Sequence, residues 1–174
     1  MWKRVIAVLL LLFAIGAAAP AAAQAKGAGQ QAEAQASTFR IRNNWSKLYL
    51  QNNGSISNGI EVVQQPRNTD GYQIFQEVVD GQYRSFWHLK SNLNMGINRG
   101  NTLPGAKAVL ANPSGAFNQD WLVVPRSGTI VELRNRGSGL CLGIYDASTA
   151  AGAVAGQFTC DGGLNQGWVK VYVV

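Results

Sequence analysis

The pattern of apolar and polar positions repeats three times between residue 39 and residue 174. Three serines are each followed by two apolar residues in alternation: Ser46 by Leu48 and Leu50, Ser91 by Leu93 and Met95, and Ser138 by Leu140 and Leu142. Such alternation is typical of a strand that buries one of its faces. Five residues before each serine stands another apolar residue, namely Ile41, Phe86 and Leu133. The same short-strand pattern is therefore predicted at three places in the chain.

A short glutamine–aromatic motif keeps the same spacing. Its three copies are Gln73-Ile74-Phe75, Gln119-Asp120-Trp121 and Gln166-Gly167-Trp168, and the aromatic positions are 46 and then 47 residues apart. Turn-forming residues separate the apolar segments, and no segment after residue 37 has a sustained helical period. The sequence therefore predicts three repeats of short strands, at about residues 39–80, 81–126 and 127–174.

Each predicted repeat has an apolar face that it cannot bury alone. Three repeats closed around a pseudo-threefold axis bury these faces together and remove most of the exposed strand edges. We therefore expect an all-β fold, a β-trefoil, over residues 38–174. The motif side chains are expected to hold this fold, the aromatic ones near the axis and the glutamines on backbone groups: Phe75, Trp121 and Trp168, and Gln73, Gln119 and Gln166.

The first 25 residues have the layout of a secretory signal peptide. Lys3 and Arg4 precede an almost wholly apolar stretch, residues 5–15, and small residues with possible A-x-A cleavage sites follow at 21–25. A transmembrane anchor is the alternative, but the apolar stretch is shorter than the roughly 20 residues that span a bilayer. Residues 26–37, rich in Ala, Gln and Gly, are expected to form a flexible leader. No later segment is apolar enough to span a membrane, and we expect a secreted protein.

The charge distribution and the titratable residues argue against two classes of function. The formal net charge is +6 and falls to +4 when Lys3 and Arg4 leave with the signal peptide. The remaining positive residues are scattered, so a nucleic-acid partner is not expected. There is one histidine, His88, and the acidic residues show no spacing that suggests a paired acid and base. We therefore expect neither catalysis nor a cofactor.

Two cysteines, Cys141 and Cys160, lie 19 residues apart in a chain that is expected to reach an oxidising compartment. A disulfide between them is predicted. A pair of metal-binding thiols is the alternative. Because the chain has one histidine and no CxxC spacing to supply further ligands, no metal site is expected.

The three glutamine–aromatic motifs, the segment Ser138-Gly139-Leu140-Cys141-Leu142 and the ending from Cys160 to Trp168 resemble the ricin-B lectin domains. The resemblance covers residues 39–174 and is strongest in the third repeat. It implies a β-trefoil that recognises sugars, such as galactose or xylose units, at up to three equivalent sites. Each site in such families carries an Asp just after the Cys-Leu pair, an aromatic ring two residues before the second Cys, and an Asn directly before the motif Gln.

This sequence departs from that pattern in all three repeats. The Asp position holds Gln51, Gly96 and Gly143, the ring position holds Gln65, Ala111 and Phe158, and the Asn position holds Tyr72, Asn118 and Asn165. The third repeat thus retains Phe158, Asn165 and Gln166, with Asp146 three residues beyond the missing Asp, and the second repeat retains Asn118 and Gln119. For each retained residue a structural role is the alternative: the glutamines in the fold, the asparagines in turns and Phe158 beside the disulfide.

Two hypotheses for the function follow. The first is a secreted carbohydrate-binding module whose one well-preserved sugar site lies in the third repeat, and whose partner is an oligosaccharide or polysaccharide. The loss of the Asp in all three repeats supports the second, a β-trefoil with decayed sugar sites that acts as a protein-binding factor or hydrolase inhibitor, because a fold does not decide a function.

Overall fold

The computed structural model describes residues 37–173, which contain twelve β-strands and four short 3-10 helices. The predicted signal peptide (residues 1–25) and nearly all of the predicted leader (residues 26–37) lie outside the described residues. Among the residues that the structure describes, no helix is long and apolar enough to cross a membrane.

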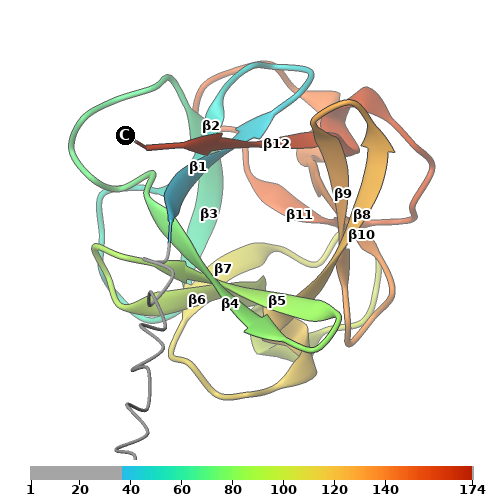
Figure 1. Ribbon diagram of the computed structural model, residues 1–174, viewed down its shortest axis with the longest axis horizontal. Coiled ribbons are helices and arrows are strands. Elements are labelled where there is room, and N and C mark those ends of the chain that lie inside the picture. Colours follow the sequence, from blue (N-terminus) through green and yellow to red (C-terminus); the bar gives the residue numbers. More distant parts are fainter. Residues whose placement is uncertain (1–36, 174) are drawn as a thin grey trace, which may run out of the picture. The chain divides into compact units, whose positions relative to one another are not determined.

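The strands form three sets of four that lie around a common centre (Figure 1). The first set is β1 (Thr38–Asn43), β2 (Tyr49–Asn52), β3 (Ile60–Gln65) and β4 (Phe75–Asp80). The second set is β5 (Tyr83–His88), β6 (Leu93–Ile97), β7 (Ala108–Ala111) and β8 (Asp120–Ser127). The third set is β9 (Ile130–Asn135), β10 (Cys141–Ile144), β11 (Ala155–Phe158) and β12 (Trp168–Tyr172). The 3-10 helices are η1 (Asn98–Gly100), η2 (Phe117–Gln119), η3 (Tyr145–Ala147) and η4 (Leu164–Gln166).

The first and last strands of the three sets form a closed ring of six. β1 pairs with β12 and β4, β5 pairs with β4 and β8, and β9 pairs with β8 and β12, all antiparallel. The two middle strands of each set form a hairpin: β2–β3, β6–β7 and β10–β11. The hairpins meet through the β3–β7 pairing and through single bridges from Val63 to Val154 and from Lys107 to Gly156. The predicted β-trefoil with three repeats around a pseudo-threefold axis is confirmed.

The residues that define the sequence pattern build the core. Equivalent residues of the three repeats are almost completely buried: Ile41, Phe86 and Leu133; Leu50, Met95 and Leu142; Phe75, Trp121 and Trp168. The indole Nε1 of Trp121 donates to the carbonyl oxygen of Met95 (3.0 Å), and that of Trp168 donates to the carbonyl oxygen of Leu142 (2.9 Å). Phe75 has no N–H to donate and contributes apolar contact alone.

The motif glutamines fasten the loop that precedes each of them. The Nε2 atoms of Gln73, Gln119 and Gln166 donate to the carbonyl oxygen seven residues earlier, at 2.7, 2.8 and 2.8 Å. Each Oε1 accepts a hydrogen bond from the backbone N–H five residues earlier. Both polar atoms of each glutamine are therefore engaged within the protein, as buried polar groups generally are.

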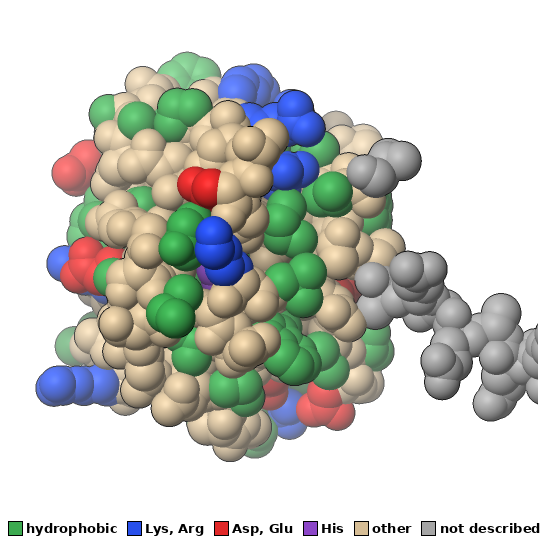
Figure 2. All heavy atoms as spheres, turned by 90° about the vertical axis from the view of Figure 1, so that its left-hand side faces the viewer, with side chains coloured by type: hydrophobic (Ala, Val, Ile, Leu, Met, Phe, Trp, Pro, Cys, Tyr) green, Lys and Arg blue, Asp and Glu red, His purple; other side chains and the backbone are tan. Residues whose placement is uncertain are grey.

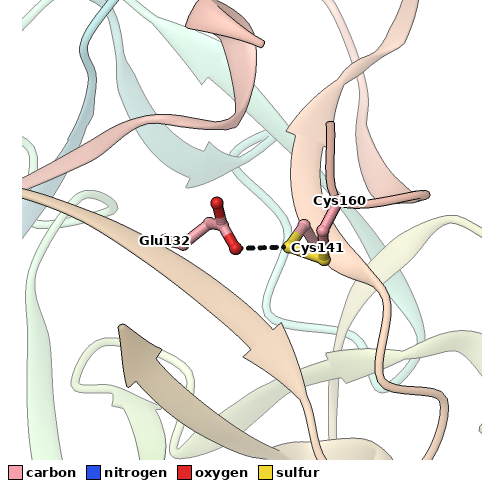
Figure 3. A group of neighbouring side chains, drawn as sticks. All are labelled: Glu132, Cys141 and Cys160. Atoms are coloured by element: carbon pink, nitrogen blue, oxygen red, sulfur yellow. Dashed lines mark hydrogen bonds between the residues drawn. A yellow bond between two sulfur atoms is a disulfide. The ribbon is translucent and has the colours of Figure 1, made fainter. Parts of the chain in front are cut away.

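The disulfide predicted between Cys141 and Cys160 is present, and it joins β10 to the loop after β11. The Cys141 Sγ lies 3.0 Å from Oε1 of Glu132 on β9 (Figure 3). Because the two sulfurs are bonded to each other, neither is a thiolate, and this cluster offers a metal ion the Glu132 carboxylate alone.

The charged side chains on the face shown in Figure 2 lie in separate groups, with Lys and Arg interspersed with Asp and Glu. Several cations of the described residues are paired. Glu77 forms ion pairs with Lys170 (2.7 Å) and Arg84 (3.3 Å), and Arg136 forms one with Asp120 (3.0 Å). This face carries no continuous basic stripe.

Candidate functional site

The three positions that the sequence analysis links to a sugar come together beside the β-hairpin in the third repeat. In the third repeat a Cβ on Gly143 of β10 would lie 3.2 Å from Cδ2 of Phe158 on β11, and 3.4 Å from Nδ2 of Asn165 on η4. The same Cβ would lie 3.1 Å from Cγ of Gln166. The structure thus places the sequence-predicted residues Phe158, Asn165 and Gln166 side by side. The three repeats differ in the side chains that occupy the space next to these positions.

The second repeat has an open cleft at this place, with a volume of about 470 Å³. Its polar lining comes from Asn98, Arg99 and Asn118 and from Asn58 of the neighbouring repeat, and its apolar lining includes Ile97, Val109 and Ala111. The Nδ2 of Asn118 donates to the carbonyl oxygen of Ile97 (2.7 Å), and its Oδ1 makes none of the hydrogen bonds within residues 37–173. Asn118 therefore presents a free acceptor to the cleft from a side chain that is already held in place.

In the third repeat the side chain of Tyr145 occupies the equivalent space. Its hydroxyl donates to the carbonyl oxygen of Gly105, and its ring lies so close to Gly156 that a Cβ there would be 2.7 Å from Cε2. The ring also packs edge-on against Phe158, with 5.0 Å between centroids. The tyrosine therefore crosses the region that is open in the second repeat, where the equivalent residue is Asn98.

In the first repeat the side chain at the Asp position closes the site. Gln51 is buried, and its Nε2 donates to the carbonyl oxygen of Asn52 (3.0 Å). Asn118 and Asn165 make the equivalent bond in the other repeats, to Ile97 and Ile144. Gln51 thus makes the hydrogen bond that an asparagine at position 72 would make, and its Oε1 is already occupied because it accepts from Asn68 and Gln73.

Asp146, the further residue that the sequence suggests for the third repeat, lies beside Tyr145. Asp146 lies in the η3 turn with φ 53° and is exposed. It lines a separate cavity of about 340 Å³ together with Lys107, Tyr145 and Ser148. Lys107 is paired there with Glu61 (2.5 Å), and this partner raises the pKa of the Lys107 ammonium.

In each repeat the backbone carbonyl of the residue before the motif glutamine is hydrogen-bonded to a side chain on the first strand of the repeat that follows around the ring. The Nδ2 atoms of Asn135 and Asn43 donate to the backbone carbonyls of Asn118 (2.9 Å) and Asn165 (2.8 Å). His88 takes the equivalent place in the second repeat, with Nε2 at 2.9 Å from the carbonyl oxygen of Tyr72. This contact makes Nε2 the protonated nitrogen, so Nδ1 accepts from the Ser91 hydroxyl at 2.7 Å.

His88 is fully buried, and burial lowers the pKa of its imidazole below the usual value of 6.5. The hydrogen bond to Tyr72 and the carboxylate of Asp70 act in the opposite direction, and Lys90 acts in the same direction as burial. His88 stands out in the sequence as the sole histidine, but this structural role was not predicted. The signal was available, because Asn43 and Asn135 occupy the equivalent position in the other repeats.

Comparison with known proteins gives a consistent result. The model of the ricin-type β-trefoil lectin domain-like family matches residues 72–158 and 117–173. Among the curated proteins no significant match was found. A designed threefold-symmetric protein, ThreeFoil, is 27% identical over 78% of this chain and 99% of its own, with a TM-score of 0.76.

Two natural proteins show the same fold in different settings. The ricin B-like lectin of Macrolepiota procera, solved in complex with lactose, is 17% identical over 78% of this chain and 95% of its own, with a TM-score of 0.68. An exo-β-1,3-galactanase from Clostridium thermocellum is 24% identical over 79% of this chain, which covers 30% of the galactanase, with a TM-score of 0.76. The family model covers more than half of the chain, and the chain therefore belongs to the ricin-type β-trefoil lectin domain-like family.

Proposed function

We propose that this protein is a secreted, non-catalytic carbohydrate-binding protein, and that the open cleft of the second repeat is its main sugar site. Membership of a lectin-like family and the lactose complex of the Macrolepiota procera lectin support sugar binding. The signal-peptide layout of residues 1–25 and the Cys141–Cys160 disulfide support export to an oxidising compartment. The second repeat is chosen as the site because its cleft is open.

The lining of the cleft matches the two kinds of surface that a sugar presents. The amides of Asn98 and Asn118 and the guanidinium of Arg99 supply donors and acceptors for hydroxyl groups. Ile97, Val109 and Ala111 supply an apolar wall for the C–H face of the ring. A shallow site of this kind binds one sugar weakly, so firm attachment calls for a polymer or several chains acting together.

The third repeat, which the sequence analysis favours, is the second candidate site. Phe158 is half-buried, and Asn165 is held by its hydrogen bond to the Ile144 carbonyl (2.9 Å). The Tyr145 ring packs against Phe158 and reduces the space that remains for a ligand. The third-repeat hypothesis therefore requires a sugar that stacks on the outer surface of these two rings.

An exchange of the differing residues tests the two sites against each other. One variant, Asn98→Tyr with Ala111→Phe, copies the aromatic pair of the third repeat into the second. The matched variant, Tyr145→Asn with Phe158→Ala, copies the second repeat into the third. Both are compared with the chain from Lys26 in a glycan array and in binding to insoluble polysaccharides.

We expect binding to be lost in the first variant and kept in the second. The opposite result would assign the sugar site to the third repeat. No binding of the unchanged protein to any glycan would contradict the proposed function and favour a protein partner.

A further inference from the structure

A second kind of site lies beside the first repeat, away from the sugar clefts. A pocket of about 390 Å³ is lined by Arg40, Tyr49, Arg67, Val171, Tyr172 and Val173. It lies where β1 pairs with β12, and Arg67 enters its lining from the segment that follows β3. Among residues 37–173, its lining includes two arginines and no carboxylate.

Arg40 is buried in this pocket without an ionic partner among residues 37–173. Its exposed fraction is 7%. Its one side-chain hydrogen bond runs from Nη2 to the carbonyl oxygen of Asn68 at 3.4 Å, and its Nε has no partner. Arginine does not lose its proton in a folded protein, so this site holds a buried positive charge. Burial of an unpaired charge is strongly unfavourable, and an anion placed beside it relieves that cost.

The third repeat shows what fills the equivalent space there. Counted from the serine and glutamine of each repeat, Arg40 corresponds to Glu132, Tyr49 to Cys141 and Arg67 to Cys160. In the third repeat these three residues form the packed cluster of the disulfide and the Glu132 carboxylate (Figure 3). The first repeat has no disulfide there. It has an open pocket, and the carboxylate has been replaced by an arginine.

We propose that this pocket binds an anionic group, a carboxylate or a sulfate ester, that is carried by a sugar residue. Arg40 and Arg67 supply charged donors for its oxygens, a pairing that gives short and strong hydrogen bonds. Tyr49 and Tyr172 add two hydroxyl groups and apolar ring surface to the same pocket. That the anion belongs to a sugar rests on the proposed function, whereas the anion site itself does not. The ligand would then be an acidic glycan.

Isothermal titration calorimetry at constant ionic strength tests the proposal with four probes: galacturonic acid, galactose 6-sulfate, galactose and inorganic sulfate. The protein variants are Arg67→Ala, Arg40→Met and, as a matched control, Arg126→Gln, which removes one exposed positive charge outside the pocket lining. We expect the two acidic sugars to bind more tightly than galactose. Arg67→Ala and Arg40→Met should weaken their binding about tenfold or more, and Arg126→Gln should leave it unchanged.

Thermal unfolding without ligand supplies an independent readout. Because Arg40→Met removes an unpaired buried charge and keeps an unbranched apolar side chain, its melting temperature should equal or exceed that of the unchanged protein. A large decrease would show that Arg40 already has a partner in the protein, and would overturn the proposal. Arg67 is exposed, so Arg67→Ala reports on binding even if Arg40→Met fails to fold.

Three further results would also overturn the proposal. The first is equal affinity of the acidic sugars for the unchanged protein and for Arg67→Ala. The second is binding of inorganic sulfate without binding of either acidic sugar. The third is binding that appears only when neutral residues are added after Val174, which would mean that a carboxylate of the chain itself fills the pocket. Failure of galactose alone to bind would count against the neutral-sugar cleft of the second repeat and leave the anion site standing.

Discussion

Gly96 and Gly143 stand at the position for which the resemblance to ricin-B lectins implies an aspartate, and their surroundings differ. A Cβ on Gly96 would lie 2.9 Å from the backbone oxygen of Asn118 and 2.8 Å from Cγ of Gln119. The three atoms nearest to a Cβ on Gly143 would all belong to side chains, those of Gln166, Phe158 and Asn165, at 3.1 Å or more. In the second repeat the backbone at Asn118 therefore occupies the space that a side chain at residue 96 would need.

This difference predicts unequal effects of the same substitution. Gly96→Ala should lower the free energy of unfolding by about 1–3 kcal/mol, because the backbone at Asn118 has to move. Gly143→Ala should cost distinctly less, because the Gln166 and Phe158 side chains can adjust. Urea unfolding of the two variants measures the difference. Equal losses would mean that the backbone of the second repeat adapts as readily as the side chains of the third.

Between strands, buried glutamines hold the hairpin loop of one repeat against the next repeat. The Nε2 of Gln157 on β11 donates to the carbonyl oxygens of Asn101 (2.8 Å) and Leu103 (3.0 Å), and its Oε1 accepts from the Ser138 hydroxyl (2.7 Å). Gln64 on β3 makes the equivalent bonds: its Nε2 donates to the carbonyl oxygens of Ser148 and Ala150 in the third repeat, and its Oε1 accepts from the Ser46 hydroxyl of its own repeat. The equivalent residue of the second repeat is Leu110, which cannot.

We predict that Gln157→Leu, which copies the second repeat into the third, lowers the free energy of unfolding by about 1–3 kcal/mol, because it leaves the two carbonyls and the hydroxyl without this partner. The loop around residues 101–103 should also exchange its amide hydrogens faster than in the unchanged protein. Urea unfolding and hydrogen exchange check both effects. An unchanged exchange rate would show that the loop is held by its own turns.

The disulfide also links two elements of one repeat, because it joins β10 to the loop after β11. In the chain-entropy model a bridge of this loop length contributes about 3 kcal/mol. The double variant Cys141→Ala, Cys160→Ala should lose a similar amount in urea unfolding, and added reductant should no longer affect it. Stability that still depends on reductant in the double variant would contradict this assignment.

The strands could be predicted from the sequence because the same pattern of apolar residues occurs independently in each of the three repeats. Alternating residues such as Leu140 and Leu142, and the fixed spacing to Trp168, report local structure that three copies reinforce. The fillings of the sugar sites were not predicted. Whether Tyr145 crosses its cleft depends on the carbonyl of Gly105, forty residues away, and a contact of that kind leaves no periodic trace in one sequence.

At the scale of the whole molecule, the ring of six strands and its three hairpins surround one continuous core. Side chains reach across the boundaries between repeats, as Asn43 does to Asn165 and His88 does to Tyr72. A single domain with one core is expected to unfold cooperatively. A change in any one of these contacts should therefore appear in the global free energy of unfolding.

His88 should make that free energy depend on pH. Its pKa is lowered in the folded protein, chiefly by burial, whereas in the unfolded chain it is near 6.5. As the pH falls below about 6.5, the unfolded state binds a proton that the folded state does not accept. The contribution of His88 to the free energy of unfolding is therefore unaffected above that pH, falls as the pH decreases toward the folded pKa, and then levels off.

The variant His88→Asn isolates this contribution, because asparagine already does the same work at Asn43 and Asn135. Its amide can donate to the Tyr72 carbonyl and carries no titrating group. Between pH 7.5 and pH 5.0, the unchanged protein should lose more of its free energy of unfolding than the variant does. The carboxylates, including Asp70, are common to both proteins, so urea unfolding at the two pH values assigns the difference to His88. Equal losses would mean that the imidazole is protonated without disturbing the fold, with Nδ1–H then donating to the Ser91 hydroxyl.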